Sequence, residues 1–401
     1  MSEDSQNKHT TILKKYPTYR DDFVNGTWKW IEGRQIDDNA EGLWRVHDKL
    51  YDLEKFVAAH PGGREWLTLT KGLDITEAFE AYHLTEKASK MLKKYYVKEA
   101  NLPRNYKFTF KDDGFYRTLK RRAAKVYEKM DKSPLWKSKI ISDLNLFLFF
   151  FTSLMFVRVR ELQSIKIILG FLAPLSCVTL MGTAHNFIHQ RNNWRMYLSV
   201  LIGVDMREWR VFHAFSHHLY PNTLNDLEIS GIGGFIFSKS DRIVWHDFLV
   251  GILPLSMLFF GGDSTISGKN FLRLFYHWNW ISFAGSLMFN SISINAGHHG
   301  KTIVHEGDEF KELDFGIYQI SAVIDRKEAN SNIFMTLTHF GNHLLHHMFP
   351  ALDHSLLPQF RAVLFETMND FKAELREFSL LDGVIAQFQQ LGRNEIIKLT
   401  K

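Results

Sequence analysis

The sequence predicts a small N-terminal α+β domain followed by an all-α membrane domain with about four transmembrane helices and a histidine-rich cap. Three observations lead to this fold class. Strand-like alternation and turn motifs occur before residue 102, four strongly apolar segments follow residue 139, and eight histidines form three tight clusters beside those segments. A chain of 401 residues is also longer than one core usually serves, so we expect at least two domains.

The net charge of +5 conceals two oppositely charged regions. Residues 37–86 include eleven acidic and five basic side chains, whereas residues 101–139 include twelve basic and four acidic ones. An acidic module followed by a basic stretch next to an apolar segment predicts a cytosolic domain tethered over an anionic membrane surface. The alternative for the basic stretch is a solvated helix face. No nucleic-acid-binding motif accompanies it, so we expect no nucleic-acid partner.

The N-terminus and the cysteine content both bear on the compartment. Residues 1–16 are polar and lack the apolar core of a signal peptide, so we expect a disordered tail that is not cleaved. Cys177 is the single cysteine of the sequence and lies in an apolar segment, which excludes an internal disulfide or a thiolate metal site. This usage fits working surfaces that face the reducing cytosol.

Residues 17–102 are expected to form the soluble domain. Segment 44–51 alternates like a strand, and Asp52 is suited to cap a following helix that carries Leu53 and Phe56. A His-Pro-Gly-Gly turn follows at residues 60–63. Because glycine tolerates close backbone contacts, His60 on this turn can meet a flat ligand at short range. His83 follows 23 residues later and can meet the opposite face of the same planar group.

These residues resemble cytochrome b5. The His-Pro-Gly-Gly turn, the Tyr-Asp-Leu before it and the Thr-x-Ala-Phe ahead of the second histidine match over most of residues 40–97. The resemblance implies a haem b with His60 and His83 as axial ligands, and an iron with two such ligands carries electrons without binding oxygen. Three carboxylates near this pocket either dock a basic reductase or form a solvated face: Asp74, Glu77 and Glu80.

Residues 103–139 are expected to form a basic amphipathic connector. Its apolar side chains recur at helical spacing, which suits a helix lying on the membrane surface. This stripe consists of Leu119, Ala123, Val126, Tyr127 and Met130.

The membrane domain is expected over residues 140–401. Apolar segments near 140–157, 165–184, 244–260 and 276–296 approach the roughly 20 residues that a span requires. Paired as two hairpins, these segments return the chain to one side of the membrane. All three histidine clusters then share the cytosolic side with the haem domain.

The histidine clusters have the spacings HX3H, HX3HH and HX2HH. In a helix, residues three and four apart lie on one face, and imidazole is a common metal ligand. A single pair of histidines at this spacing is structural about as often as it binds a metal, but three such clusters in one chain favour a metal site. Histidine ligands alone do not identify the metal, since zinc and copper also bind such sites. The clusters are His185 and His189, then His213, His217 and His218, then His343, His346 and His347.

The three boxes resemble those of the membrane fatty acid desaturase and hydroxylase superfamily, and with the N-terminal domain the chain resembles cytochrome b5-fused fatty acid desaturases. The motifs His218-Leu-Tyr-Pro-Asn222 and His347-Met-Phe-Pro350 support this. The resemblance implies two Fe ions held by the eight box histidines, by His299 as a ninth ligand and by Asn295 through a water, with His298 as the alternate to His299. Asp226, Glu228, Asp314 and Gln319 either orient the imidazoles or are ordinary surface residues.

The resemblance implies O2-dependent desaturation of a long-chain fatty-acyl lipid, with electrons from the fused haem domain. It implies a multi-pass endoplasmic reticulum protein that works with an NADH-cytochrome b5 reductase and with membrane lipids. Front-end desaturases usually carry Gln where His343 stands, so the double-bond position is not implied. The alternatives are a lipid hydroxylase on the same diiron centre and a non-enzymatic membrane haem or electron-transfer protein. A zinc hydrolase would leave the haem module without a role.

Five further histidines fall outside the boxes, and we interpret them as ordinary polar or interfacial residues. They are His246, His277, His305, His339 and His354.

Overall fold

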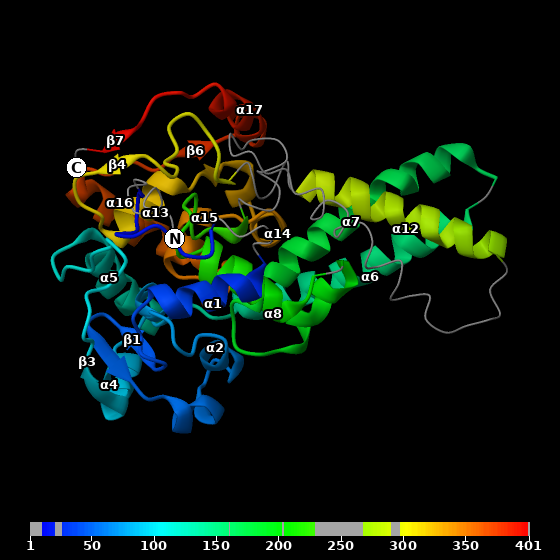
Figure 1. The fold of residues 1–401 in the computed structure, drawn as a ribbon. Coiled ribbons are helices and arrows are strands. Elements are labelled where there is room, and N and C mark those ends of the chain that lie inside the picture. Colours follow the sequence, from blue (N-terminus) through cyan, green and yellow to red (C-terminus); the bar gives the residue numbers. More distant parts are fainter. Residues whose placement is uncertain are drawn as a thin grey trace.

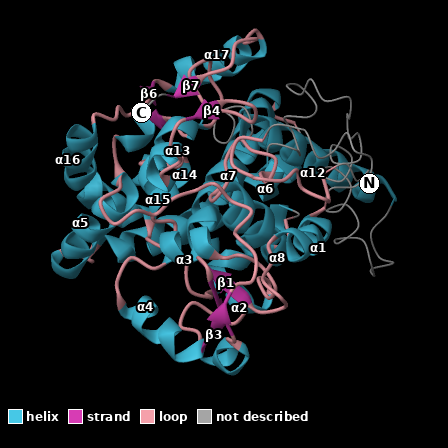
Figure 2. Cartoon of the chain, turned by 60° about the vertical axis from the view of Figure 1, so that its left-hand side comes forward, coloured by secondary structure: helices cyan, strands magenta, loops and turns pink. Residues whose placement is uncertain are grey.

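The computed structural model describes residues 10–20, 26–159, 161–202, 204–228, 268–289 and 297–399 (Figure 1). Mixed α/β structure at the N-terminus is followed by a mostly helical region, as the sequence predicts. One three-stranded sheet lies in the N-terminal part, and the other strands described pair only two by two (Figure 2).

The N-terminal sheet is antiparallel, in the order β1 (Trp44–Val46), β2 (Lys49–Tyr51) and β3 (Tyr96–Glu99). Trp44 pairs with Tyr51 across the β1–β2 hairpin. The single strand predicted over 44–51 is therefore wrong. His47 has a left-handed backbone conformation, with φ of 54°, and turns the chain back on itself.

Short helices complete this domain. The N-cap of the 3-10 helix η2 is Leu53, so the cap predicted at Asp52 is wrong by one residue; the Asp52 side chain instead accepts a hydrogen bond of 3.1 Å from the Glu54 amide in a local turn. The helical segments are α1 (Thr27–Asp37), η2 (Glu54–Ala59), α2 (Glu65–Thr68), α3 (Thr76–Tyr82), α4 (Lys87–Leu92) and η3 (Lys93–Tyr95).

The N-terminal segment packs into the core from residue 10 onward. Ile12 and Leu13 are buried, and Leu13 forms an antiparallel bridge with Tyr106. The tail predicted to be disordered over residues 1–16 is thus ordered from residue 10, because these apolar side chains leave water. Residues 1–9 lie outside the described part of the chain.

The connector contains the amphipathic helix α5 (Phe115–Lys129). Its apolar face packs against α13 (Phe315–Ala322) and α16 (Arg361–Phe371), so protein covers the face that was expected to lie on the membrane. Leu119 and Ala123 of the predicted stripe are fully buried there. The helix is therefore part of the globular core.

Three long helices lie side by side and project from the rest of the chain (Figure 1): α6 (Pro134–Arg158), α7 (Gln163–Ile188) and α12 (Gly268–Met288). Among the described residues, α6 and α7 are long and apolar enough to cross a membrane. Many large apolar side chains on all three are exposed, for example Phe147, Ile167 and Phe283. The predicted span near 244–260 lies outside the described residues, so the four-span topology stays a prediction.

The remaining elements form a cap over one end of these helices. A Cβ at Gly182 of α7 would collide with the carbonyl oxygen of Thr338, so glycine permits α7 to approach the cap closely. The cap elements are η4 (Trp194–Ile202), α8 (Met206–Trp209), η5 (Arg210–His217), β4 (Glu309–Phe310), β5 (Asp325–Arg326), η8 (Glu328–Asn330), α14 (Ile333–Thr338), α15 (His343–Met348), η9 (His354–Phe360), β6 (Glu377–Phe378), α17 (Leu380–Leu391) and β7 (Lys398–Leu399), together with α13 and α16.

Candidate metal centre and haem pocket

The two predicted haem ligands face one another. The ring centroids of His60 and His83 are 6.3 Å apart. Each ring directs Nδ1 at a backbone carbonyl, that of Gly63 at 2.9 Å and that of Phe79 at 3.0 Å, which leaves both Nε2 atoms as acceptors. Since imidazole nitrogens bind metals at about 2 Å, one iron between the rings fits this spacing.

The surroundings of the two rings suit a flat apolar group. Phe56 and Phe79 lie beside His60 and His83 at centroid distances of 5.9 and 4.8 Å. A Cβ at Gly62 would lie 3.0 Å from the His60 ring, which explains the glycine of the turn. Burial lowers the pKa of both histidines, that of His83 to about 4, so both rings are neutral and can donate a lone pair.

The acidic residues near this pocket are neither a docking surface nor a solvated face. Asp74 and Glu77 are fully buried, and the guanidinium of Arg104 binds both, at 2.6 Å and 2.7 Å. Glu80 is also buried and pairs with Arg117 and Lys120 of the connector. Both sequence alternatives for these carboxylates are therefore wrong, because the connector neutralises them within the chain.

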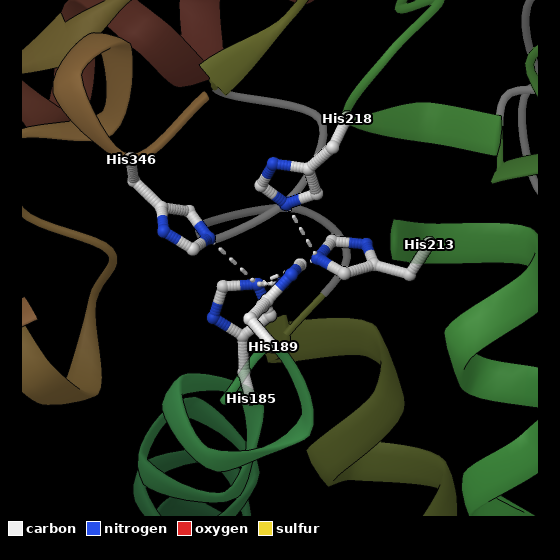
Figure 3. A group of neighbouring side chains, drawn as sticks. All are labelled: His185, His189, His213, His218 and His346. Atoms are coloured by element: carbon white, nitrogen blue, oxygen red, sulfur yellow. Dashed lines mark hydrogen bonds between the residues drawn. The ribbon is translucent and has the colours of Figure 1, made fainter. Parts of the chain in front are cut away.

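A first group of metal-binding character contains five buried histidines whose ligand nitrogens lie within 4.8 Å of one another. Figure 3 shows their rings converging from α7, η5 and α15. The Nε2 atom of His185 lies 2.6 Å from that of His213, and 3.2 and 3.3 Å from those of His189 and His346. Nitrogens bound to one ion at about 2 Å are separated by similar distances. The group is His185, His189, His213, His218 and His346.

A second group lies beside the first and contains His217, His298 and His347. The Nε2 atoms of His217 and His298 are 3.0 Å apart. His343 borders this group, with ring centroids 4.7 Å from His298 and 4.8 Å from His347. A third group, His213, His217 and Glu228, shares one histidine with each of the other two, so the number of ions stays a prediction.

The paired histidines of boxes two and three divide between the groups. His217 and His347 belong to the second group, while their chain neighbours His218 and His346 belong to the first. Consecutive helical residues point in different directions, so one dipeptide can serve two ions. In η5 the amide of His218 donates to the carbonyl of His213 at 2.9 Å, a π-type bond, and this winding brings the Nε2 atoms of these two rings to 2.9 Å.

Free nitrogen atoms inside the groups fit metal ions. His347 Nδ1 lies 3.2 Å from the Gln319 side-chain oxygen, while its Nε2 is buried with no hydrogen-bond partner. Buried polar atoms are almost always satisfied, so a lone pair left open here is explained by an ion. Neighbouring rings also lower the pKa of buried His346 and His347, after the larger effect of burial, which keeps them neutral.

Carboxylates orient one ring in each group. His217 Nδ1 lies 3.0 Å from Asp226, and His213 Nδ1 lies 2.7 Å from Glu228. Burial alone would lower the pKa of His217, but Glu228 and Asp226 outweigh it and raise the pKa to about 9. Of the expected orienting residues, Asp314 lies elsewhere: it caps α13 by accepting from backbone amides.

His299, expected as the ninth ligand, does not join either group. Its ring stacks on His305 at a centroid distance of 5.4 Å, whereas the neighbouring His298 takes the place in the second group. His298 lies in a turn and His299 in no regular element, so the helix assumed at residue 299 is not present there. Asn295 itself lies outside the described residues.

His354 was interpreted as an ordinary residue, yet it is buried with its ring 4.0 Å from that of His346. Its position outside the boxes gave no signal of this. The other outlying histidines that the structure describes, His277, His305 and His339, belong to neither group, and His246 lies outside the described residues.

A small pocket opens onto both groups. Its histidine wall includes His185, His213 and His217, and Glu228 also lines it. The rest of the lining includes the aromatic residues Trp209, Phe289 and Phe340. The cavity has a volume of about 20 Å³, which admits about one water molecule, so it is a small space beside the two groups and not a channel for an acyl chain.

Comparison with known proteins agrees with this organisation. Residues 27–101 match the family model of the Cytochrome b5-like Heme/Steroid binding domain. The chain is 36% identical over 429 residues to a Cytochrome b5-related protein of Drosophila melanogaster, covering 97% of this chain and 96% of that one. It is 31% identical over 214 residues to a Probable Delta(5) fatty acid desaturase C of Dictyostelium discoideum, covering 50% of this chain and 46% of that one. No solved structure matches the chain. The resemblance to cytochrome b5-fused desaturases is confirmed.

Proposed function

Because this chain belongs to the family of the cytochrome b5-related proteins, which has fatty acid desaturases among its partial relatives, we propose that it desaturates a long-chain fatty-acyl lipid with O2. One observation carries the proposal. Two groups of buried histidines, each with nitrogens within 4.8 Å, lie in the same chain as a facing pair of haem-ligand histidines. Two iron ions held by these groups would supply, with dioxygen, the oxidant that removes hydrogen from an unactivated methylene.

The side chains around the groups support this reaction by binding, orientation and exclusion of water. The histidines would place ring lone pairs on two ions without carrying negative charge themselves, and His217 would give up its extra proton when the ion binds. Asp226 and Gln319 fix the rings of His217 and His347. Trp209, Phe289 and Phe340 make the lining of the small cavity beside both groups partly apolar, which would help to exclude water from the site.

The haem module gives the electron supply. His60 and His83 would hold the haem with no open iron position, so its role is to relay electrons that an NADH-cytochrome b5 reductase provides. The apolar helices α6 and α7 would place the protein in the endoplasmic reticulum membrane, with the haem domain and the cap in the cytosol.

The test is expression in cells that lack the activity, followed by profiling of total lipids. We expect new unsaturated acyl chains with the wild type and none with His217→Ala or His60→Ala. The purified protein should carry haem and about two irons. Hydroxylated chains in place of unsaturated ones would establish the hydroxylase, whereas identical profiles for the wild type and both variants would overturn the proposal.

A further inference from the structure

One direct contact links the haem module to the first histidine group. The hydroxyl of Tyr82 lies 2.9 Å from Nδ1 of His189. Tyr82 immediately precedes the haem ligand His83, and His189 belongs to the five-histidine group. One side chain and one hydrogen bond therefore separate the backbone of a haem ligand from a metal-ligand ring.

The geometry decides the direction of this hydrogen bond when a metal is bound. For Nε2 of His189 to offer its lone pair to an ion, the ring proton must lie on Nδ1, which then donates to the Tyr82 oxygen. The hydroxyl proton needs another acceptor, and the carbonyl of Ala214 lies 3.4 Å away. Tyr82 can thus accept from His189 and donate to Ala214 at the same time.

Packing holds Tyr82 in this position. Its ring lies 5.0 Å from Trp66, and Trp66 in turn lies 5.2 Å from Phe215 of η5, with the Arg210 guanidinium 4.5 Å over its ring. The haem turn also touches the loop after box one, since a Cβ at Gly63 would lie 2.7 Å from the side-chain oxygen of Asn192. Both contacts fix the haem module against the cap.

We infer that Tyr82 is a positioning residue of the metal centre supplied by the haem module, and that the path His83–Tyr82–His189 carries electrons from haem to metal. This inference rests on the proposed function. In each transfer one electron leaves a ferrous haem iron, which becomes ferric, and reduces one ferric ion of the histidine centre to the ferrous state. The proton on His189 Nδ1 stays in place, and the reductase restores the haem.

The test uses full-length protein in detergent with Tyr82→Phe, which keeps the ring against Trp66 and removes only the hydroxyl. The readouts are iron content, the haem absorption spectrum, and the rate at which prereduced haem is reoxidised after mixing with O2 in a stopped-flow instrument. We expect a wild-type haem spectrum and haem reoxidation slowed about ten- to a hundredfold, with iron content lowered, since loss of a partner that orients a ligand has effects of this size.

Tyr116→Phe is the matched control. Its buried hydroxyl also joins the haem module to the cap, donating to the carbonyls of Glu80 and Met348 at 3.1 Å, but it does not contact the histidine groups. We expect this variant to match the wild type in iron content and reoxidation rate. Equal losses in both variants would mean that a loosened interface, rather than the Tyr82 contact, is responsible, and would overturn the inference.

The outcomes also separate this inference from the proposed function. A Tyr82→Phe variant that equals the wild type in iron content and reoxidation rate overturns the role of Tyr82, even if the wild type makes unsaturated lipid. A wild type that binds iron and reoxidises its haem through Tyr82 but makes no unsaturated product overturns the desaturase alone. A wild type without iron overturns both.

Discussion

Arg104 is the residue whose loss should most strongly weaken the attachment of the haem module to the connector. Its guanidinium is buried and binds Asp74 at 2.6 Å and both oxygens of Glu77 at 2.7 and 2.8 Å. The two carboxylates are themselves 1% and 0% exposed. Arg104→Met retains most of the volume of the side chain and removes the charge, which leaves two buried carboxylates without their cation.

The expected loss of stability depends on the hydrogen bonds that the two carboxylates retain. Asp74 still accepts from Thr76, and Glu77 still accepts from the Tyr220 hydroxyl at 3.2 Å, so the cost is less than the sum of three charge-assisted hydrogen bonds. Breaking a buried ion pair by removing one partner costs about 3–5 kcal/mol. At roughly 2–4 °C per kcal/mol, the unfolding midpoint should fall by about 6–20 °C.

The assay is thermal unfolding of the purified full-length protein, followed by tryptophan fluorescence and by haem absorbance. Lys111→Met is the control, because Lys111 pairs with Glu312 at 3.1 Å with both side chains more than half exposed, and such a pair contributes about 1 kcal/mol or less. Adding Asp74→Asn and Glu77→Gln to Arg104→Met removes the two unpaired charges and should recover part of the loss in the unfolding midpoint. If Arg104→Met and Lys111→Met had the same unfolding midpoint, the buried ion pairs of Arg104 would not be what stabilises the haem module.

Two further predictions concern Glu80 and the choice of second-group ligand. Burial alone would raise the pKa of Glu80, but His47, Lys120 and Arg117 outweigh it and hold the pKa well below its ordinary value. The ion pairs of Glu80 therefore stabilise the fold fully above the unfolded pKa of about 4.5 and lose this effect as pH falls toward the folded pKa. The difference in unfolding midpoint between the wild type and Glu80→Gln should be constant from pH 7 to 5 and shrink below that; a constant difference at pH 3.5 would contradict this. For the metal centre, His298→Ala should lower the iron content and His299→Ala should not, measured by elemental analysis against haem, and the reverse result would restore the sequence-based choice.

The haem site could be predicted from the sequence because its determinants are local. The ligand His60 sits on the turn whose glycines it needs, and His83 follows the short helix α3. In so short a segment, few conformations let the two histidines face one another while the hydrophobic residues between them are buried. The direction of each ring, set by the carbonyls of Gly63 and Phe79, required only neighbouring backbone.

The metal centre was predictable only in part, since its groups are assembled from distant segments. Spacing identified the eight box histidines but could not divide neighbours such as His346 and His347 between the two groups. The choice of His299 assumed a helix through residue 299, whereas the chain turns there and directs His298 inward. His354 reaches His346 through the fold of η9, which no local pattern encodes.

The connector changes how electron supply should be understood. A flexible tether raises the local concentration of a donor, and its effect depends on its length. Here the chain that leaves β3 is buried at Arg104, Tyr106 and Phe108 before it enters α5, so no free tether connects the two modules in this part of the chain. Under the proposed function, the haem ligands would then be held at a fixed distance from the histidine groups, and no diffusive search would precede electron transfer. Lengthening the connector should therefore not speed haem reoxidation, whereas a substitution that loosens the buried interface, such as Arg104→Met, should slow haem reoxidation before it releases the haem.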